Sequence, residues 1–237
     1  MQAKKSSSGM FLVFRLPLLL LLLLALLLGL GYGGWRLYYG RYADRAGAIR
    51  RGMREHIEGL KSYHARFKTV PVGVEDEPTY SVELWREPPH RYRIEMSSGG
   101  EGRQQGPQVI IGDRDGAYYY DPESAGFIPL DEKEGNGVSG AFLENYWCSI
   151  SEAADLNYIG EEKGVRHRYY QIEVIPSEPH RHRVSERVWL EQDSFLPVRI
   201  ESFDAAGRLT QVTVFELLQL NPVLEAALFQ VEGGRSP

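Results

Sequence analysis

Two histidines, His180 and His182, stand one residue apart, a spacing that places both imidazole rings on one face of a strand. Imidazole nitrogens at such a spacing are typical ligands of zinc and other transition metals. The pair follows Pro179, lies among arginines and has no cysteine or patterned carboxylate nearby. A solvated loop explains it better than a metal site, so neither a metal nor another cofactor is expected.

Nucleophiles are the next candidates for chemistry. The stretch 137–140, Gly-Val-Ser-Gly, lacks the second glycine of a nucleophile elbow, because Ala141 follows it. Cys148 lies beside Trp147 in an apolar helical pattern, where a small buried hydrophobe is favoured over a reactive thiol. His56 has no second histidine four residues away, as a zinc protease would need. The carboxylates are scattered through turns and strand exteriors, so we expect no enzyme.

Aromatic and apolar side chains are more informative. Tyr118 and Tyr120 share a strand face, which is either the wall of a cavity or ordinary core. The apolar helix Phe142–Ile150 fits a lid over a cavity and a part of the core equally well. The candidates for lining an apolar ligand cavity are Tyr80, Val82, Leu84, Tyr92, Ile94, Tyr118, Tyr120, Phe142, Tyr146 and Trp147.

The elements that must position these residues follow from apolar periodicity. An amphipathic helix is predicted from Tyr42 to Leu60, and a second over Phe142–Ile150. Between and after them the period changes from 3.6 to 2, which predicts half-buried strands. These lie near 63–68, 80–85, 91–96, 109–112, 117–120, 127–130, 157–161, 168–175, 185–191, 196–203 and 209–217.

Turn signals such as Asp113–Gly116 and Asp204–Gly207 separate these strands. Consecutive hairpins imply an antiparallel sheet, and a sheet of about ten or eleven strands tends to curl. A helix laid across the open side of a curled sheet would enclose an apolar cavity. The predicted fold class is therefore α+β, a curved antiparallel sheet with covering helices.

Charge is distributed unevenly over the 237 residues. The chain has 27 basic and 32 acidic residues, a net charge of −5. Nine basic and three acidic residues lie in 36–68, whereas 69–237 has 15 basic and 29 acidic residues, a net charge of −14. Clustered positive charge, which phosphate binding needs, is thus missing from the body, so nucleic acid is not an expected partner.

The composition of the N-terminal region is typical of a membrane-spanning segment. Twelve of the fifteen residues in 16–30 are leucine, and the apolar run extends over 10–35. A signal peptide or an uncleaved signal anchor would begin this way, and the aromatic residues Trp35, Tyr38 and Tyr39 favour the retained anchor. We predict a cytoplasmic tail at 1–9, a transmembrane anchor at 10–35, a neck at 36–41 and a folded domain at 42–237.

Three stretches, taken in order, resemble the LolA-like family of bacterial lipoprotein carriers and their sporulation and germination relatives in Gram-positive bacteria. Trp85–Ile94 resembles the family's strand, proline turn and strand, and Ile110–Pro122 its apolar strand, Asp-Gly turn and aromatic strand closed by Asp-Pro. The third stretch runs from Val188 to Phe229. The resemblance covers roughly residues 42–231.

The resemblance implies a half-barrel closed by helices, with an apolar interior that in the carriers holds acyl chains. In those carriers an arginine directly before the proline helps to fasten the lid. Here Glu87 holds that place, with Arg86 one position earlier on the opposite strand face. An anchored chain with so short a neck cannot leave its membrane, so shuttling between membranes is not expected.

The charges after the anchor and the family resemblance predict opposite sides of the membrane for the folded domain. The arginines after the anchor would keep the body in the cytoplasm by the positive-inside rule, whereas members of the family work outside the cytoplasmic membrane. We place the body outside, as a single-pass protein that binds a lipid acyl chain or a lipoprotein in its apolar cavity. The alternative is a non-enzymatic scaffold or regulator of envelope or spore assembly and germination, in which the acidic sheet docks a protein partner.

Overall fold

The computed structural model describes residues 24, 27–30, 40, 44–73, 78–99, 107–130, 142–153, 155–165, 167–176, 179 and 181–231. The chain divides into two compact units, Met1–Arg45 and Ala46–Pro237. Most of the predicted tail (1–9), anchor (10–35) and neck (36–41) lies outside the described residues, which include only short helical pieces there. Among the residues that are described, none of the helices is both long enough and apolar enough to span a membrane.

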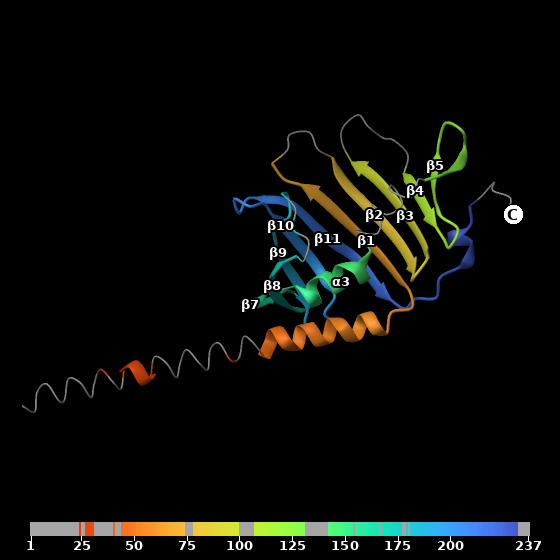
Figure 1. Cartoon of the computed structure of the whole chain (residues 1–237). Coiled ribbons are helices and arrows are strands. Elements are labelled where there is room, and N and C mark those ends of the chain that lie inside the picture. The colour runs from red at the N-terminus through yellow and green to blue at the C-terminus, as the bar shows by residue number, and fades with distance from the viewer. Residues whose placement is uncertain are drawn as a thin grey trace, which may run out of the picture. The chain divides into compact units, whose positions relative to one another are not determined.

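The second unit is built on one sheet of eleven strands, in the order β6-β5-β4-β3-β2-β1-β11-β10-β9-β8-β7 (Figure 1). Every neighbouring pair is antiparallel, and β1 joins the N-terminal and C-terminal halves of the sheet through its pairing with β11. The strands are β1 (Tyr63–Pro71), β2 (Thr79–Glu87), β3 (Arg91–Gly99), β4 (Gln108–Gly112), β5 (Ala117–Asp121), β6 (Gly126–Pro129), β7 (Asp155–Lys163), β8 (Arg168–Ile175), β9 (Ser185–Glu191), β10 (Pro197–Phe203) and β11 (Leu209–Leu220).

Alternation of burial along the chain favours strands, and it is strict in β9. In β9, every second residue is buried, namely Glu186, Val188 and Leu190, while the residues between them are half-buried. Burying one face of such a strand fixes its register, because a slip by one residue would turn the apolar set to solvent. The strands predicted from the two-residue period are all confirmed, with boundaries that differ by a few residues.

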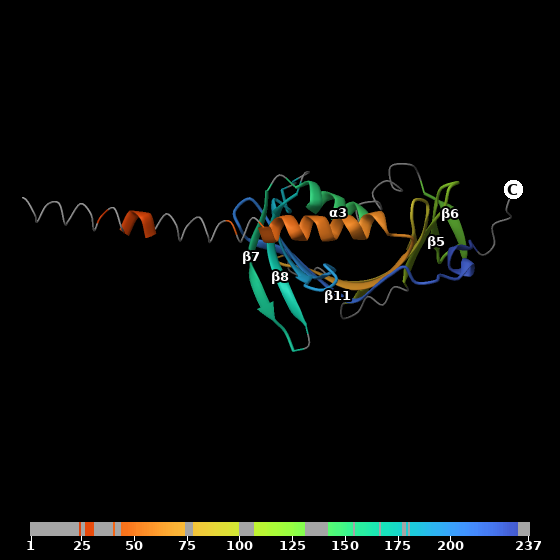
Figure 2. The same cartoon turned by 90° about the horizontal axis from the view of Figure 1, so that it is seen from below.

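The sheet curves rather than lying flat, as Figure 2 shows. Register shifts interrupt the pairing at Arg66/Phe67 in β1, at two points in β10 and at Tyr158/Gly160 in β7. An extra residue on one side of a strand pair bends that strand and increases its twist. The bulges at the centre of the sheet thus contribute to the hollow on one of its faces.

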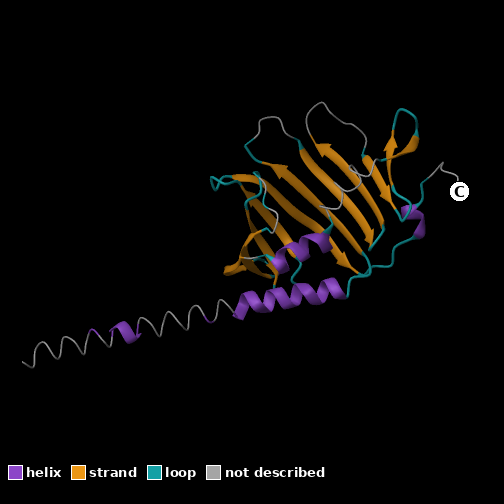
Figure 3. Cartoon of the chain, viewed as in Figure 1, coloured by secondary structure: helices purple, strands orange, loops and turns teal. Residues whose placement is uncertain are grey.

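Two helices lie against that face, which we call the inner face (Figures 1 and 3). One is the helix of residues 44–58, of which 46–58 belongs to the second unit, and the other is α3 (Leu143–Glu152). Ile49 and Met53 of the first helix and Trp147 of α3 are buried in one core with Tyr63 and Val188 of the sheet. A short 3-10 helix, η2 (Ala226–Phe229), follows the last strand.

The expected α+β class and the curved antiparallel sheet with covering helices are therefore confirmed. The expected transmembrane helix at 10–35 lies largely outside the described residues and stays a prediction.

Candidate ligand pocket

A pocket of about 710 Å³ opens on the inner face beside α3. Strands β1, β2, β10 and β11, the start of β9 and α3 all contribute to its wall. The residues that line it are Tyr63, Ala65, Phe67, Thr69, Pro71, Val72, Tyr80, Leu84, Leu143, Tyr146, His182, Arg183, Glu186, Ile200, Ser202, Thr210, Gln211, Thr213 and Phe215. Its volume lies in the range of pockets that bind small molecules.

One part of the pocket is aromatic and apolar. Phe67 and Phe215 face each other across the β1–β11 pair with ring centroids 5.3 Å apart. Leu84 of β2 and Ile200 of β10 continue this surface on either side, and Leu143 of α3 contributes from the helix. This part of the wall suits an alkyl chain, because it offers apolar contact area and few groups that need a hydrogen bond.

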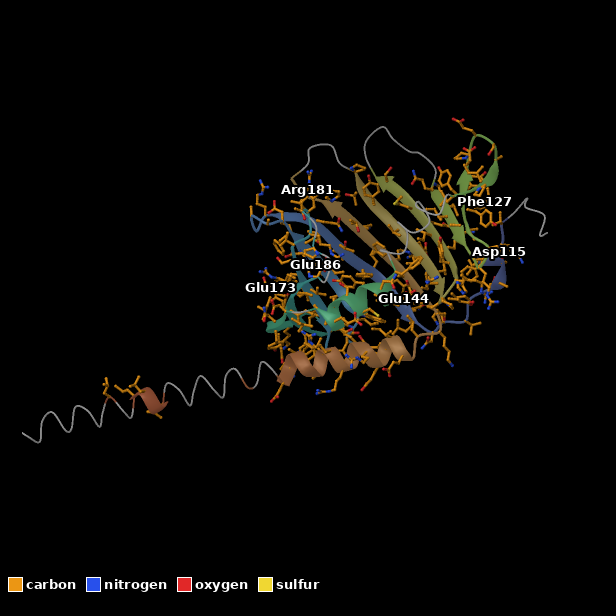
Figure 4. All side chains as sticks on the ribbon, in the orientation of Figure 1. Asp115, Phe127, Glu144, Glu173, Arg181 and Glu186 are labelled. Atoms are coloured by element: carbon orange, nitrogen blue, oxygen red, sulfur yellow. The ribbon has the colours of Figure 1, made fainter. Side chains whose placement is uncertain are left out.

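The other part is polar and carries an ion pair in which the carboxylate is buried and the guanidinium is partly exposed. Glu186 is 3% exposed. Arg183 donates to both its carboxylate oxygens, from Nε to Oε1 at 2.7 Å and from Nη2 to Oε2 at 3.1 Å. Ser202 of β10 donates its hydroxyl to Oε1 at 3.2 Å. Figure 4 labels Glu186 in the half of the sheet near α3, with which it shares the pocket wall.

Tyr146 of α3 stands between these two parts. Its ring centroid lies 5.7 Å from the guanidinium carbon of Arg183. Burial, and then the charge of Glu186, raise the pKa of Tyr146 well above its usual value. Its buried hydroxyl makes no hydrogen bond of standard geometry among the described residues, although the carboxylate of Glu186 lies close enough to interact with it. The phenol is thus a neutral group beside Glu186.

The N-terminal end of α3 is fastened to the sheet by Arg86. This side chain of β2 donates from Nε to Oε1 of Glu144 at 2.8 Å, and its guanidinium carbon lies 3.9 Å from the ring centroid of Phe142. Arg86 and Glu87 do face opposite sides, as the alternation predicts, but Arg86 is the one that faces α3. The register decides this, because Arg86 pairs with Tyr63, whose side chain belongs to the buried core. The proline-adjacent Glu87 pairs instead with Arg91.

Tyr63 also helps to hold this helix. Its hydroxyl oxygen accepts a hydrogen bond from the backbone N–H of Leu143, the first residue of α3, at 3.0 Å. Burial, followed by the charge of Glu144, raises the pKa of Tyr63 well above the usual range, so the hydroxyl keeps its proton. The pocket wall formed by Leu143 and Tyr146 is thereby tied to β1 and β2.

The C-terminal end of α3 rests on the helix of residues 46–58. Arg50 donates to the backbone carbonyls of Ser151 at 2.8 Å and Ala153 at 2.9 Å, which the helix itself leaves without partners. The ring of His56 stacks on Trp147 with centroids 5.8 Å apart. The two covering helices thus form one connected layer over the inner face.

Three of the ten cavity candidates, Tyr80, Leu84 and Tyr146, line the pocket. Five others belong to or pack against the neighbouring core: Val82, Tyr92, Ile94, Phe142 and Trp147. The remaining two, Tyr118 and Tyr120, lie on the opposite face of the sheet, because Tyr118 pairs with Ile111 and not with Ile110, the pairing partner of Ile94. Figure 4 shows their neighbour Phe127, the cross-strand partner of Tyr120, at the end of the sheet away from Glu186.

Most polar residues of the pocket were not among the candidates. Arg183, Glu186, Ser202 and Thr213 come from the C-terminal half of the sheet, which enters the pocket only because β1 pairs with β11. A signal for one of them was present in the sequence. Glu186 shares a strand face with Val188 and Leu190, so the two-residue period already places a carboxylate on a face that is otherwise buried.

The residues weighed first for chemistry are distributed as follows. His182 lines the pocket, its ring nitrogen accepts a hydrogen bond from Arg181 at 2.6 Å, and His180 lies outside the described residues. The part of the chain that is described contains no group of three or more histidine, cysteine or acidic side chains that could hold a metal ion. Cys148 is half-buried, less than expected, because it lies beside the buried face of α3. The serine stretch 137–140 lies outside the described residues.

No family model matches the chain, and no curated protein sequence matches it. Solved structures do match. MucB is 15% identical, and the match covers 80% of this chain and 64% of that of MucB with a TM-score of 0.49. The chain therefore spans less than two thirds of the length of MucB. MucB has also been solved in complex with MucA(peri).

Two further solved structures cover nearly their whole length. A LolA superfamily protein from Nitrosomonas europaea is 13% identical, with 78% of this chain and 97% of that chain covered and a TM-score of 0.36. LprF from Mycobacterium bovis is 9% identical, with 77% and 96% covered and a TM-score of 0.49. The solved structures that match this chain thus include the LolA-like family that its sequence resembles.

Proposed function

We propose that this protein binds the acyl chain of a membrane lipid or of a lipoprotein in the pocket beside α3. The observation that carries the proposal is the pocket of about 710 Å³ on the inner face, with the Phe67–Phe215 pair in its wall. The apolar wall replaces the bilayer interior around the acyl chain. A lipid that leaves the membrane for this pocket thereby avoids a cost of about 0.8 kcal/mol for each methylene group that it would otherwise expose to water. The proposal assigns no catalytic step to the pocket.

The proposal includes the predicted anchor at 10–35 and a body held outside the cytoplasmic membrane. An anchor keeps the pocket near a lipid surface, and the basic residues of 36–68 would attract anionic headgroups. A tethered protein of this kind takes up or presents a lipid at its own membrane instead of carrying it across the envelope.

Metabolic labelling tests the binding. Bacterial cells expressing the full chain are fed a fatty acid that carries a photoreactive diazirine, irradiated, and the labelled peptides are mapped by mass spectrometry. Labelling is expected in the β1 and β11 peptides that contain Phe67 and Phe215. Their absence from the labelled set would overturn the proposal.

Two adjacent substitutions provide a matched control for this experiment. Thr213 lines the pocket, whereas Val214 points to the opposite face and is 39% exposed. Thr213→Phe fills the pocket and is expected to reduce labelling of the β1 and β11 peptides. Val214→Phe adds a larger side chain outside the pocket and should leave that labelling unchanged.

The second candidate function is a scaffold that docks a basic protein partner. The observation that favours it is the net charge of −14 over 69–237. Crosslinking in intact cells would then give one defined protein partner whose capture weakens as ionic strength rises. A labelled pocket together with no such partner would favour the lipid function over this one.

A further inference from the structure

At the polar end of the pocket, Arg183 and Glu186 form an ion pair in which each charge has the other as its partner. Three donor groups occupy the carboxylate of Glu186, two from Arg183 and one from Ser202. The Arg183 side chain is 30% exposed, and it lines the same pocket. The pair places no net charge at this end, although it holds two of the strongest polar groups in the wall.

Hydrogen-bonding capacity remains there for a ligand. A guanidinium group has five N–H donors. Two of those of Arg183 bind Glu186, and the described residues provide no partner for its Nη1. The hydroxyl of Tyr146 lies at the same end, beside Glu186, and makes no hydrogen bond of standard geometry among the described residues. A ligand that reaches this end of the pocket therefore meets donors for its oxygen atoms.

The charge of the ligand head determines how favourably that head binds at the polar end of the pocket. A carboxylate or phosphate placed against Arg183 would lie close to Glu186, and the repulsion between two like charges at short distance disfavours binding of the charged head. An ammonium group would be repelled by the charge of Arg183, and three of the about four acceptor sites of the Glu186 carboxylate are already in use. An ester or hydroxyl oxygen accepts the free hydrogen bonds without either penalty.

We infer that the Arg183–Glu186 pair makes this pocket selective for an uncharged acylglycerol head over an anionic head on the same acyl chain. The inference rests on the proposed function, which places the acyl chain along the apolar part of the wall. The chemistry is shared by two sources, a free acylglycerol of the membrane and the acylglycerol group of a lipoprotein.

Two photoreactive probes that differ only in the head test this selectivity. The full chain is placed in nanodiscs of dioleoylphosphatidylcholine containing either a diazirine fatty acid or its 1-monoacylglycerol ester, at a mildly alkaline pH that ionises the free acid. The acylglycerol is expected to label the peptides of Phe67 and Phe215 about tenfold more than the acid does. Equal labelling, or stronger labelling by the acid, overturns the inference and leaves the proposed function standing. Labelling of these peptides by neither probe overturns the proposed function itself.

Substitutions at Glu186 and at a control position test whether the Arg183–Glu186 pair causes the preference for the acylglycerol head. Glu186→Gln leaves Arg183 charged, so the preference should shift toward the fatty acid. Glu201→Gln removes the same charge from a pair with Arg199 on the opposite face of the sheet and should leave the ratio unchanged. An unchanged ratio in Glu186→Gln, with the fold intact by circular dichroism, contradicts the inference.

Removing one member of a buried pair can unfold a protein, so the double variant Arg183→Met/Glu186→Leu supplies a second test. It removes both charges and the N–H donors of Arg183, so labelling by the acylglycerol probe should fall. Unchanged labelling by that probe would overturn the role of the pair. In the unmodified protein, competition of the acylglycerol probe with dioleoylglycerol and with N-acetyl-S-(dioleoyloxypropyl)cysteine amide, both uncharged, identifies the source. Oleate is the anionic competitor in the same assay. Displacement of the probe by either uncharged lipid supports the inference, and displacement by oleate alone contradicts it.

Discussion

Arg86 of β2 and Glu144 of α3 form a buried ion pair, with Nε of Arg86 2.8 Å from Oε1 of Glu144 and only 6% and 15% of the two side chains exposed. Arg86 also donates from Nη2 to the carbonyl of Pro89 at 3.0 Å, so the β2–β3 turn and the helix are joined through one guanidinium. Because Leu143 and Tyr146 on the same helix line the pocket, this pair positions part of the pocket wall.

The first prediction concerns that pair. Arg86→Met would leave the carboxylate of Glu144 buried without its partner, and a buried pair broken on one side costs about 3–5 kcal/mol of stability. Urea unfolding of the full chain in detergent measures this loss. The control is Arg91→Met, which breaks the more exposed Arg91–Glu87 pair and should cost less than about 1 kcal/mol. Equal losses in the two variants would contradict a special role for Arg86.

Local periodicity was sufficient to predict the strands, and the same period could not decide which face of each strand is inner. Tyr118 and Tyr120 share a face, as alternation requires, yet pairing with Ile111 places that face away from the pocket. The proline turn pointed to Glu87 as the place of the lid arginine, and only the pairing of Arg86 with Tyr63 turns Arg86 toward α3. Faces depend on long-range register, which no short stretch of sequence contains.

The pocket was only partly predictable for a related reason. Its apolar wall from β1 and β2 follows from neighbouring strands, whereas Arg183 and Glu186 reach it from a distant part of the chain. A charged residue in step with Val188 and Leu190 is the kind of signal that could have pointed to Glu186. Its partner Arg183 precedes the strand and carries no periodic signal.

The second prediction concerns the support of α3 by Arg50. Arg50→Met removes two hydrogen bonds from a charged donor to the terminal carbonyls of α3, a loss of about 1–3 kcal/mol. Hydrogen exchange of the α3 amides should accelerate, because the last turn of the helix opens more often. Arg54→Met, at an exposed position of the same helix, serves as the control and should leave that exchange unchanged.

The third prediction concerns a close approach at Gly52. A Cβ atom built there would lie 2.4 Å from the Phe195 ring, which also stacks on Tyr170. Gly52→Ala is therefore expected to lower the free energy of unfolding by about 1–3 kcal/mol. Gly47→Ala is the matched control, because a Cβ there meets only the flexible end of Arg51 at 3.5 Å. That variant should be stabilised by up to about 1 kcal/mol through helix propensity, and a loss as large as at Gly52 would contradict the explanation.

The fourth prediction concerns the side of the membrane on which the body lies. Val223 is fully exposed, so Val223→Cys in a Cys148→Ser background gives one accessible thiol. A membrane-impermeant maleimide should label it in intact cells if the body is extracytoplasmic. A cysteine placed in the tail, Ser7→Cys, should react only after the cells are permeabilised. The reverse pattern would instead follow the positive charges after the anchor and place the body in the cytoplasm.

The last prediction concerns acid and the β10–β11 turn. The carboxylate of Asp204 accepts hydrogen bonds from the backbone N–H groups of Ala206 and Arg208, both at 2.9 Å, and from Nε of Arg208. The backbone bond from Arg208 and then its side-chain bond hold the pKa of Asp204 below its usual value, so the stabilisation is present above the ordinary aspartate pKa of about 4 and is lost as the pH falls through the lowered one. Protection of the Ala206 and Arg208 amides against hydrogen exchange, relative to the intrinsic rate at each pH, should therefore fall in that acidic range. Asp204→Asn keeps an acceptor oxygen without the titrating charge, so its protection should be lower at neutral pH and independent of pH; an acid transition that persists in this variant would assign the effect to another group.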